Sequence, residues 1–197
     1  TIVPRDGESQ YMLAVAYAAD GQLQAAVASV DKALKLGIPR SRFLGGTKTG
    51  LEPLRKMEDF QALFSDASPL VHGPMLGQNT GTGISIWIRT ASACLVKAEV
   101  RERGNSNSVT NGADKSQAAS DYTAVVRVDG LRANRDYEYT LTLGDNQLPE
   151  VYKFRTLAEK HQQTKFRVAF GGGAGFVPAN EYAWNTIGEQ RPDVLML

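Results

Sequence analysis

The apolar residues between positions 8 and 37 recur three and four residues apart, which is the spacing of one face of a helix. The pattern predicts two antiparallel helices joined by a turn at Asp20-Gly21. Gly37 suits the residue that follows a helix, and Pro39 prevents the second helix from continuing. A weaker helical pattern follows in Leu51, Leu54, Met57, Phe60, Leu63 and Phe64.

Between residues 71 and 156 the period changes to two, because apolar residues alternate with polar ones. The clearest alternation runs from Ile84 to Arg89, and four further segments follow, which begin at Val96, Tyr122, Tyr137 and Val151. Such alternation predicts antiparallel strands that are buried on one face. The stretch 104–119 is rich in Ser, Asn and Gly and is predicted to be a mobile loop.

The last part of the chain has the order strand, glycine-rich loop, helix and strand. Alternating residues up to Phe170 are followed by Gly171–Gly175, a helical stretch at 178–190 and the apolar run 194–197. This order predicts one βαβ unit, and a continuous apolar run is typical of a parallel strand that neighbours cover on both faces. Ligands of such sheets bind beyond the carboxyl ends of the strands, so the loop after Phe170 is the expected site.

The composition is that of an ordinary globular protein, with 42% hydrophobic and 22% charged residues and a net charge of +1. Neither residues 1–68 nor the rest of the chain has a charge excess that would favour nucleic acid, and no apolar run is long enough to span a membrane. No signal peptide is visible. The chain starts with Thr1 rather than Met, which fits removal of an export signal or a shortened chain.

The loop Gly171–Gly175 matches neither common phosphate-binding fingerprint. A dinucleotide motif that starts at Gly171 needs glycine where Phe176 stands, and a Walker loop needs a Gly-Lys-Ser/Thr sequence that is absent. A structural tight turn is therefore favoured on the motif alone. Gly144-Asp145-Asn146 resembles a metal-ligating turn, but it lies between two predicted strands and is interpreted as a hairpin turn.

The residues that most often carry chemistry lie apart in the sequence. His72 and His161 lack a second ligand at helical spacing, and Cys94 is the only cysteine and has no histidine near it. An intrachain disulfide is excluded, and neither a metal site nor a nucleophile is predicted within the chain. Asp193 is predicted to open the last strand.

Two segments resemble known families. The order of small and large residues in the helical hairpin resembles one tetratricopeptide repeat, although Gln10 stands where that repeat usually has Trp. Leu131 and Tyr137 have the spacing of the tyrosine corner of a Greek-key sandwich. This segment resembles a fibronectin type III domain, with Trp87 in the place of that family's core Trp.

The order of several motifs resembles the PhoD-like phosphatase family. These motifs are His72-Gly73-Pro74, Ile86-Trp87-Ile88-Arg89, Phe170-Gly-Gly-Gly-Ala174 and the strand Pro192–Leu197. The resemblance implies a fibronectin-like domain before a metallophosphoesterase domain that hydrolyses phosphate esters with bound metals. Where the best-known members have Gly-Ser-Cys, this chain has Gly171-Gly172-Gly173, so Gly173 replaces the cysteine that ligates iron.

The predicted fold is multidomain α + β, in three parts. These are a helical cap similar to a tetratricopeptide repeat (1–68), a fibronectin III-like β-sandwich (69–157) and the first βαβ unit of an α/β metallophosphoesterase domain (158–197). The predicted substrate-pocket residues are Gly171, Gly172, Gly173 and Asn180. No catalytic residue or metal ligand is expected within the chain.

The resemblance implies that the chain is the N-terminal part of an alkaline phosphatase or phosphodiesterase and is not catalytic alone. The complete enzyme would use calcium, iron, zinc or manganese, and the partner would be the remainder of the catalytic domain, as a second chain or a missing C-terminal part. A secreted or periplasmic location is expected. The purple acid phosphatases are a near alternative. A non-catalytic scaffold, in which the helical and sandwich parts dock on a partner chain, is the alternative from another class.

Overall fold

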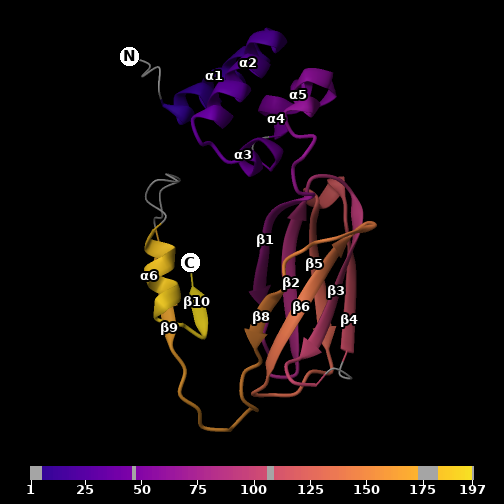
Figure 1. Ribbon diagram of the computed structural model, residues 1–197, viewed down its shortest axis with the longest axis vertical. Coiled ribbons are helices and arrows are strands. Elements are labelled where there is room, and N and C mark those ends of the chain that lie inside the picture. The colour runs from indigo at the N-terminus through magenta and orange to yellow at the C-terminus, as the bar shows by residue number, and fades with distance from the viewer. Residues whose placement is uncertain (1–5, 46–47, 106–108, 173–181, 197) are drawn as a thin grey trace. The chain divides into compact units, whose positions relative to one another are not determined.

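The computed structural model describes residues 6–45, 48–105, 109–172 and 182–196. The chain divides into two compact units. The first comprises the chain up to Pro74 together with Ile88–Cys94 and Lys115–Ala124, and the second comprises Met75–Trp87, Leu95–Asp114 and the chain from Val125 onward. Figure 1 labels most of the helices and strands.

The first unit contains the helical part of the chain. The helices between Gly7 and Ala62 are α1 (Gly7–Ala19), α2 (Leu23–Lys35), α3 (Arg40–Leu44), α4 (Lys48–Leu51), the 3₁₀ helix η1 (Glu52–Lys56) and α5 (Glu58–Ala62). Asp6 caps α1, because its carboxylate accepts hydrogen bonds from the backbone N–H and the hydroxyl of Ser9, at 2.9 and 2.6 Å. The two helices expected between residues 8 and 37 are present as α1 and α2.

Small residues line the contact between α1 and α2. Ala14, Ala26 and Ala33 are fully buried, so the two helix backbones can approach closely. Larger side chains from the shorter helices complete this core, which includes Phe43, Leu51, Leu54 and Phe60. The Phe43 ring lies 5.4 Å from that of Tyr11, centroid to centroid. Burial of each large side chain stabilises the fold by about 1.5–3 kcal/mol.

Two β-sheets follow, as the period-two pattern predicts, and they form a β-sandwich. One sheet has the order β1-β2-β5, from β1 (Leu70–Gly77), β2 (Gly83–Thr90) and β5 (Thr123–Asp129). The other has the order β4-β3-β6-β7, and β8 also pairs with β6. Its strands are β3 (Cys94–Glu102), β4 (Val109–Ser116), β6 (Asp136–Leu143), β7 (Asn146–Gln147) and β8 (Tyr152–Arg155).

The central pair of the second sheet shows the expected alternation. β3 and β6 are antiparallel, with Val96 opposite Leu143 and Val100 opposite Tyr139. These four side chains are at most 3% exposed, whereas the intervening Lys97 is exposed and Glu99 is half-buried. One face of the sheet therefore contributes to the apolar core, and the other is polar.

The predicted loop at 104–119 is wrong over its middle part, because Val109–Ser116 forms β4. The sequence gives a weak strand signal there, since only Val109 and Ala113 are apolar. Pairing within the sheet overrides this composition. Gly112 lets the backbone of β5 approach β4 closely, because a Cβ at this position would collide with the backbone carbonyl of Arg127. Asp114 of β4 accepts a hydrogen bond from the N–H of Val125 in β5, at 2.7 Å.

The tyrosine corner is present, but the core tryptophan is not. The Tyr137 hydroxyl accepts a hydrogen bond from the N–H of Arg132 at 2.8 Å, and Leu131 is 5% exposed. Trp87 is only partly buried, because it alternates with the fully buried Ile86 and Ile88 and therefore lies on the opposite face of β2. The core position that the resemblance assigned to Trp87 is filled by isoleucines.

The end of the described chain contains β9 (Val168–Phe170), α6 (Ala183–Glu189) and β10 (Val194–Met196). β9 and β10 pair in parallel, with Val168 opposite Val194 and Phe170 opposite Met196. Asp193 precedes β10, and its carboxylate accepts a hydrogen bond from the N–H of Arg167 at 2.8 Å. Asp193 therefore fixes the start of the strand pair, as expected from its place before the apolar run.

Candidate functional site

The loop after β9 begins with two exposed glycines. The Gly171 N–H donates to the carbonyl of Met196 at 3.1 Å, which extends the pairing of β9 and β10 by one residue. A Cβ built at Gly171 or Gly172 would meet no atom within 4 Å, and neither residue has a φ in the left-handed region. The local backbone therefore does not require glycine at either position. Gly173 and Asn180 lie outside the described residues.

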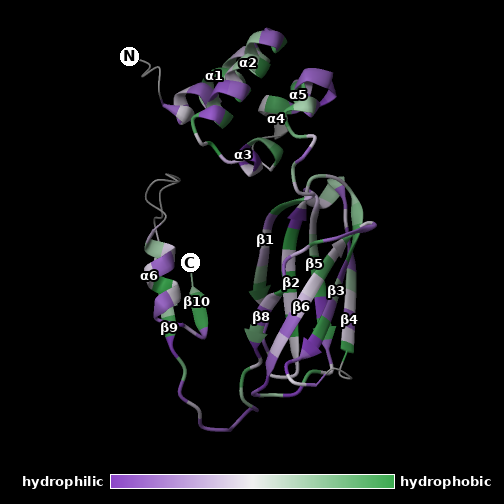
Figure 2. Ribbon diagram, in the orientation of Figure 1, coloured by the Kyte–Doolittle hydropathy of each residue, from purple (hydrophilic) through white to green (hydrophobic). Residues whose placement is uncertain are grey.

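The strands beside this loop expose apolar side chains. Phe170 is 84% exposed, Met196 59%, Leu195 44% and Val168 43%. Figure 2 shows the apolar colouring of β10. Strands of parallel sheets are normally covered on both faces, and exposed apolar patches mark interaction surfaces. The pair β9–β10 thus has the composition of a buried strand pair, although several of its apolar side chains are exposed.

The described residues offer no cluster of three or more His, Cys, Asp or Glu side chains that could hold a metal ion. His72 lies near Arg89, and burial followed by the charge of Arg89 lowers the pKa of the imidazole below 6.5. His161 is exposed, in the segment after β8. The Cys94 thiol lies 3.6 Å from the Ser116 hydroxyl, within a hydrogen-bonded group that also contains Thr90.

Gly144-Asp145-Asn146 is a hairpin loop, as predicted. Asn146 pairs with Leu143 at the start of β7, and the Gly144 N–H donates to the carbonyl of Leu95 at 2.8 Å. Gly144 has a φ of 61°, which a glycine adopts without strain. Asp145 and Asn146 are exposed. The turn geometry therefore accounts for these residue types.

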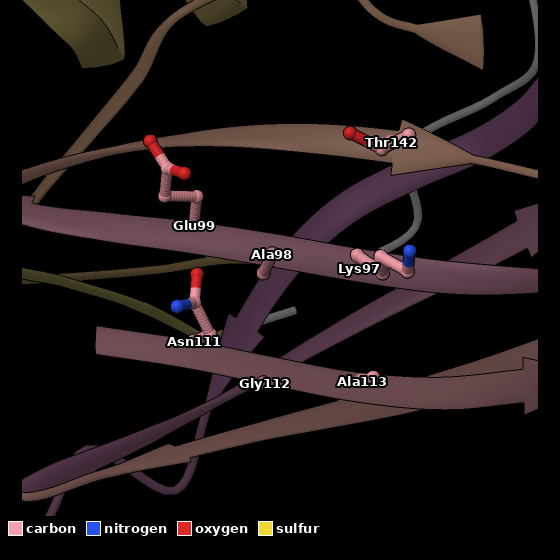
Figure 3. A pocket seen from close by; sticks show the side chains of 7 residues that line it. All are labelled: Lys97, Ala98, Glu99, Asn111, Gly112, Ala113 and Thr142. Carbon is pink, nitrogen blue, oxygen red and sulfur yellow. The ribbon is translucent and has the colours of Figure 1, made fainter. Parts of the chain in front are cut away.

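A depression lined by residues of β3, β4 and β6 was not predicted from the sequence. It has a volume of about 330 Å³ and is lined by Lys97, Ala98, Glu99, Asn111, Gly112, Ala113 and Thr142 (Figure 3). Glu99 also pairs with Arg101, at 2.5 Å between carboxylate and guanidinium. Alternating polar residues occur on every half-buried strand, so no sequence signal distinguishes these positions from an ordinary solvated face.

No helix in the described ranges combines the length and the apolar character that crossing a membrane requires.

Comparison with family models gives a match over residues 67–169, to a family described as "Domain of unknown function (DUF7800)". The chain belongs to this family. The match to the DUF7800 model runs from just before β1 into β9, so it includes the whole sandwich. No curated protein matches the chain.

Comparison with solved structures shows the fold. The chain is similar to the structure of PhoD, with a TM-score of 0.54 and 21% identity, over 62% of this chain. It spans 26% of the PhoD chain, or about a quarter. A sensor domain of the anti-sigma factor RsgI4 from Pseudobacteroides cellulosolvens (TM-score 0.35, 17% identity) is matched over 47% of this chain and 98% of its own. A redesigned β-sandwich protein (TM-score 0.36, 11% identity) is also matched over 47% of this chain and 98% of its own.

Proposed function

We propose that this chain is the N-terminal part of a PhoD-like, metal-dependent phosphoesterase. The observation that carries the proposal is the similarity of its fold to the structure of PhoD, of which it spans about a quarter. The order of motifs from His72 to the last strand supports the same assignment. On this proposal the substrate is a phosphate ester, and the protein is secreted or periplasmic.

In this proposal β9, α6 and β10 are the first βαβ unit of the metallophosphoesterase domain. The parallel pairing of Val168 with Val194 supports it, because a helix between two parallel strands is the usual crossover. The exposure of Phe170 and Met196 supports further strands and helices, from a second chain or a continuing one, that cover the pair. The helices up to residue 68 would then be a cap similar to a tetratricopeptide repeat.

The loop after β9 would form one rim of the substrate pocket. Gly171 already donates its N–H to Met196, so backbone donors for an anionic oxygen would come from Gly172 and Gly173. Neither local crowding nor a left-handed φ requires a glycine at position 172. We therefore propose that the missing side chain lets a substrate group approach the backbone closely. Asn180 is proposed to reach the rim with its carboxamide.

The metals of the complete enzyme would be held elsewhere. Because the described residues contain no group of ligands, we assign no step of hydrolysis to them. The resemblance implies calcium, iron, zinc or manganese, and the replacement of cysteine by Gly173 favours oxygen and nitrogen ligands over an iron thiolate. The contribution of this chain is then to position the catalytic domain and to supply the glycine loop.

The test is hydrolysis of p-nitrophenyl phosphate, a monoester, and of bis(p-nitrophenyl) phosphate, a diester, by the protein purified from its source. The proposal expects hydrolysis of at least one ester, its loss after chelation and its recovery when one of the four metals is restored. A preparation that hydrolyses neither ester with any of these metals would contradict the proposal. The same result would favour the alternative, a non-catalytic scaffold.

Asn180 gives a second test in the complete enzyme. Asn180→Ala is expected to lower kcat/KM by about tenfold or more, the effect of losing a hydrogen bond to a charged group. Asn185→Ala, on the exposed surface of α6, is the matched control and is expected to leave the kinetics unchanged. Equal kinetics for both variants would remove Asn180 from the site without touching the assignment to phosphoesterases.

A further inference from the structure

Two arginines from outside α3 hold the carbonyl groups at its end. Arg55, from η1, donates to the carbonyls of Phe43 and Leu44, at 3.4 and 2.9 Å. Arg89, from β2, donates through Nη1 to the carbonyl of Gly45 at 2.7 Å. The last carbonyls of a helix have no partner within the helix, so these contacts fix where α3 ends. All of these residues belong to the first unit.

Asp121 fixes the direction of the Arg89 side chain. The guanidinium forms an ion pair with the Asp121 carboxylate, and its Nε donates to the Asp121 carbonyl at 3.3 Å. The Arg89 side chain is 20% exposed, so little water competes for its donors. With one side of the planar group held by Asp121, the remaining Nη1 donor points to Gly45.

His72, from β1, lies against the same contact. Its Nδ1 is 3.5 Å from Nη1 of Arg89, and a Cβ built at Gly45 would lie 2.6 Å from its Cε1. Only glycine fits at this point between α3 and the imidazole. A neutral imidazole can accept a hydrogen bond through Nδ1, whereas an imidazolium would bring a second positive charge against the guanidinium.

We propose that Gly45, His72, Arg89 and Asp121 form a pH-sensitive latch. When His72 is neutral, Arg89 holds the Gly45 carbonyl, and the end of α3 stays on β1 and β2. When His72 is protonated, its repulsion of Arg89 releases Gly45. The latch therefore couples the attachment of the helical segment to the pH around the protein.

The charges around His72 set the sign of the effect. Arg89 faces it from β2, and the Asp121 carboxylate is paired with Arg89. Arg55 from η1 donates to the Leu44 carbonyl, and its Nε lies 3.7 Å from the Glu52 carboxylate. Asp121 offsets part of the repulsion, but burial adds to it, and the pKa of His72 is lowered from 6.5. The latch is thus at full strength above about pH 6.5 and weakens as the pH falls toward the lowered pKa.

The test uses hydrogen exchange of the full chain, followed by mass spectrometry at about pH 7.5 and about pH 5, which bracket the ordinary titration of histidine. Protection of residues 40–45 is corrected for the pH dependence of intrinsic exchange. We expect a several-fold loss of protection at the lower pH. His72→Asn should abolish this loss, because its carboxamide oxygen can replace Nδ1 and cannot be protonated.

The chain supplies its own control, since His161 is the only other histidine. His161→Asn should keep the pH-dependent loss, and Arg89→Ala should lose protection at both pH values. A loss that persists in His72→Asn, or protection that is independent of pH in the wild type, would overturn the proposal. An NMR titration of the His72 imidazole in the wild type decides the matter without any variant, because a His72 pKa at or above 6.5 would also overturn it.

Discussion

Polar side chains at the turn before β6 satisfy backbone groups that the strands leave unpaired. The Tyr137 hydroxyl accepts from the N–H of Arg132, while the Thr156 hydroxyl donates to the Arg132 carbonyl at 2.7 Å and accepts from the N–H of Arg135 at 3.0 Å. The role of Tyr137 could be predicted, because its spacing from Leu131 is local. The role of Thr156 could not, because it reaches back 24 residues to Arg132 without any local pattern.

Removing the Tyr137 hydroxyl tests the tyrosine corner. Tyr137→Phe leaves the partly buried N–H of Arg132 without its acceptor, so the free energy of unfolding should fall by about 1–2 kcal/mol. Tyr152→Phe is the matched control, because the Tyr152 ring is half-buried and stacks on that of Tyr139, with 5.1 Å between the ring centroids. We expect this variant to change the free energy of unfolding by less than about 0.5 kcal/mol. Urea unfolding measures both, and equal effects would contradict a specific role for the corner.

Tyr139 makes stability depend on alkaline pH. Burial, with a smaller effect from Tyr152, raises the pKa of Tyr139 far above 10.0. Because its folded pKa exceeds the unfolded one, the neutral side chain stabilises the fold fully below about pH 10, and this contribution declines as the pH rises further. Tyr139→Phe should reduce the slope of stability against pH above about pH 10. An unchanged slope in urea unfolding would contradict this prediction.

At the scale of elements, the hydrophobic pattern predicted the long, periodic elements well and the polar ones poorly. α1 and α2 and the strands β2, β3, β5 and β6 follow from their periods of 3.6 and 2. β4 was missed because its signal is tertiary, arising from its place at the edge of the sheet and from the close approach at Gly112. Trp87 was misassigned because an alternating pattern does not reveal which face of a strand is buried when both carry apolar residues.

The strand pair β9–β10 gives a prediction about cover. Phe170 is 84% exposed, so Phe170→Ser should change the unfolding free energy of this chain by less than about 0.5 kcal/mol. In the complete enzyme, where the proposal places further strands and helices over this residue, the same change should destabilise by about 3–5 kcal/mol, as large-to-small changes in a core do. Thermal or urea unfolding of both forms measures the difference. A neutral effect in the complete protein would contradict the proposed cover.

At the scale of the molecule, the order of motifs carried more information than any single motif. The similarity to PhoD could be anticipated from His72-Gly73-Pro74, the Trp87 strand and the glycine loop, and the fold similarity covers 62% of the chain. The position of Gly171 and Gly172 directly after β9 follows from the strand pattern, whereas their role in a substrate pocket stays a prediction. The ligands that would make it a metal site are absent from the described residues, so no pattern within them could indicate the chemistry.

Native mass spectrometry of the protein purified from its source tests whether this chain is one part of a metal-containing phosphoesterase. We expect a mass above 21.4 kDa, from a second polypeptide or a longer chain that contains this one, together with bound calcium, iron, zinc or manganese. A lone chain of 21.4 kDa that carries no metal would contradict it.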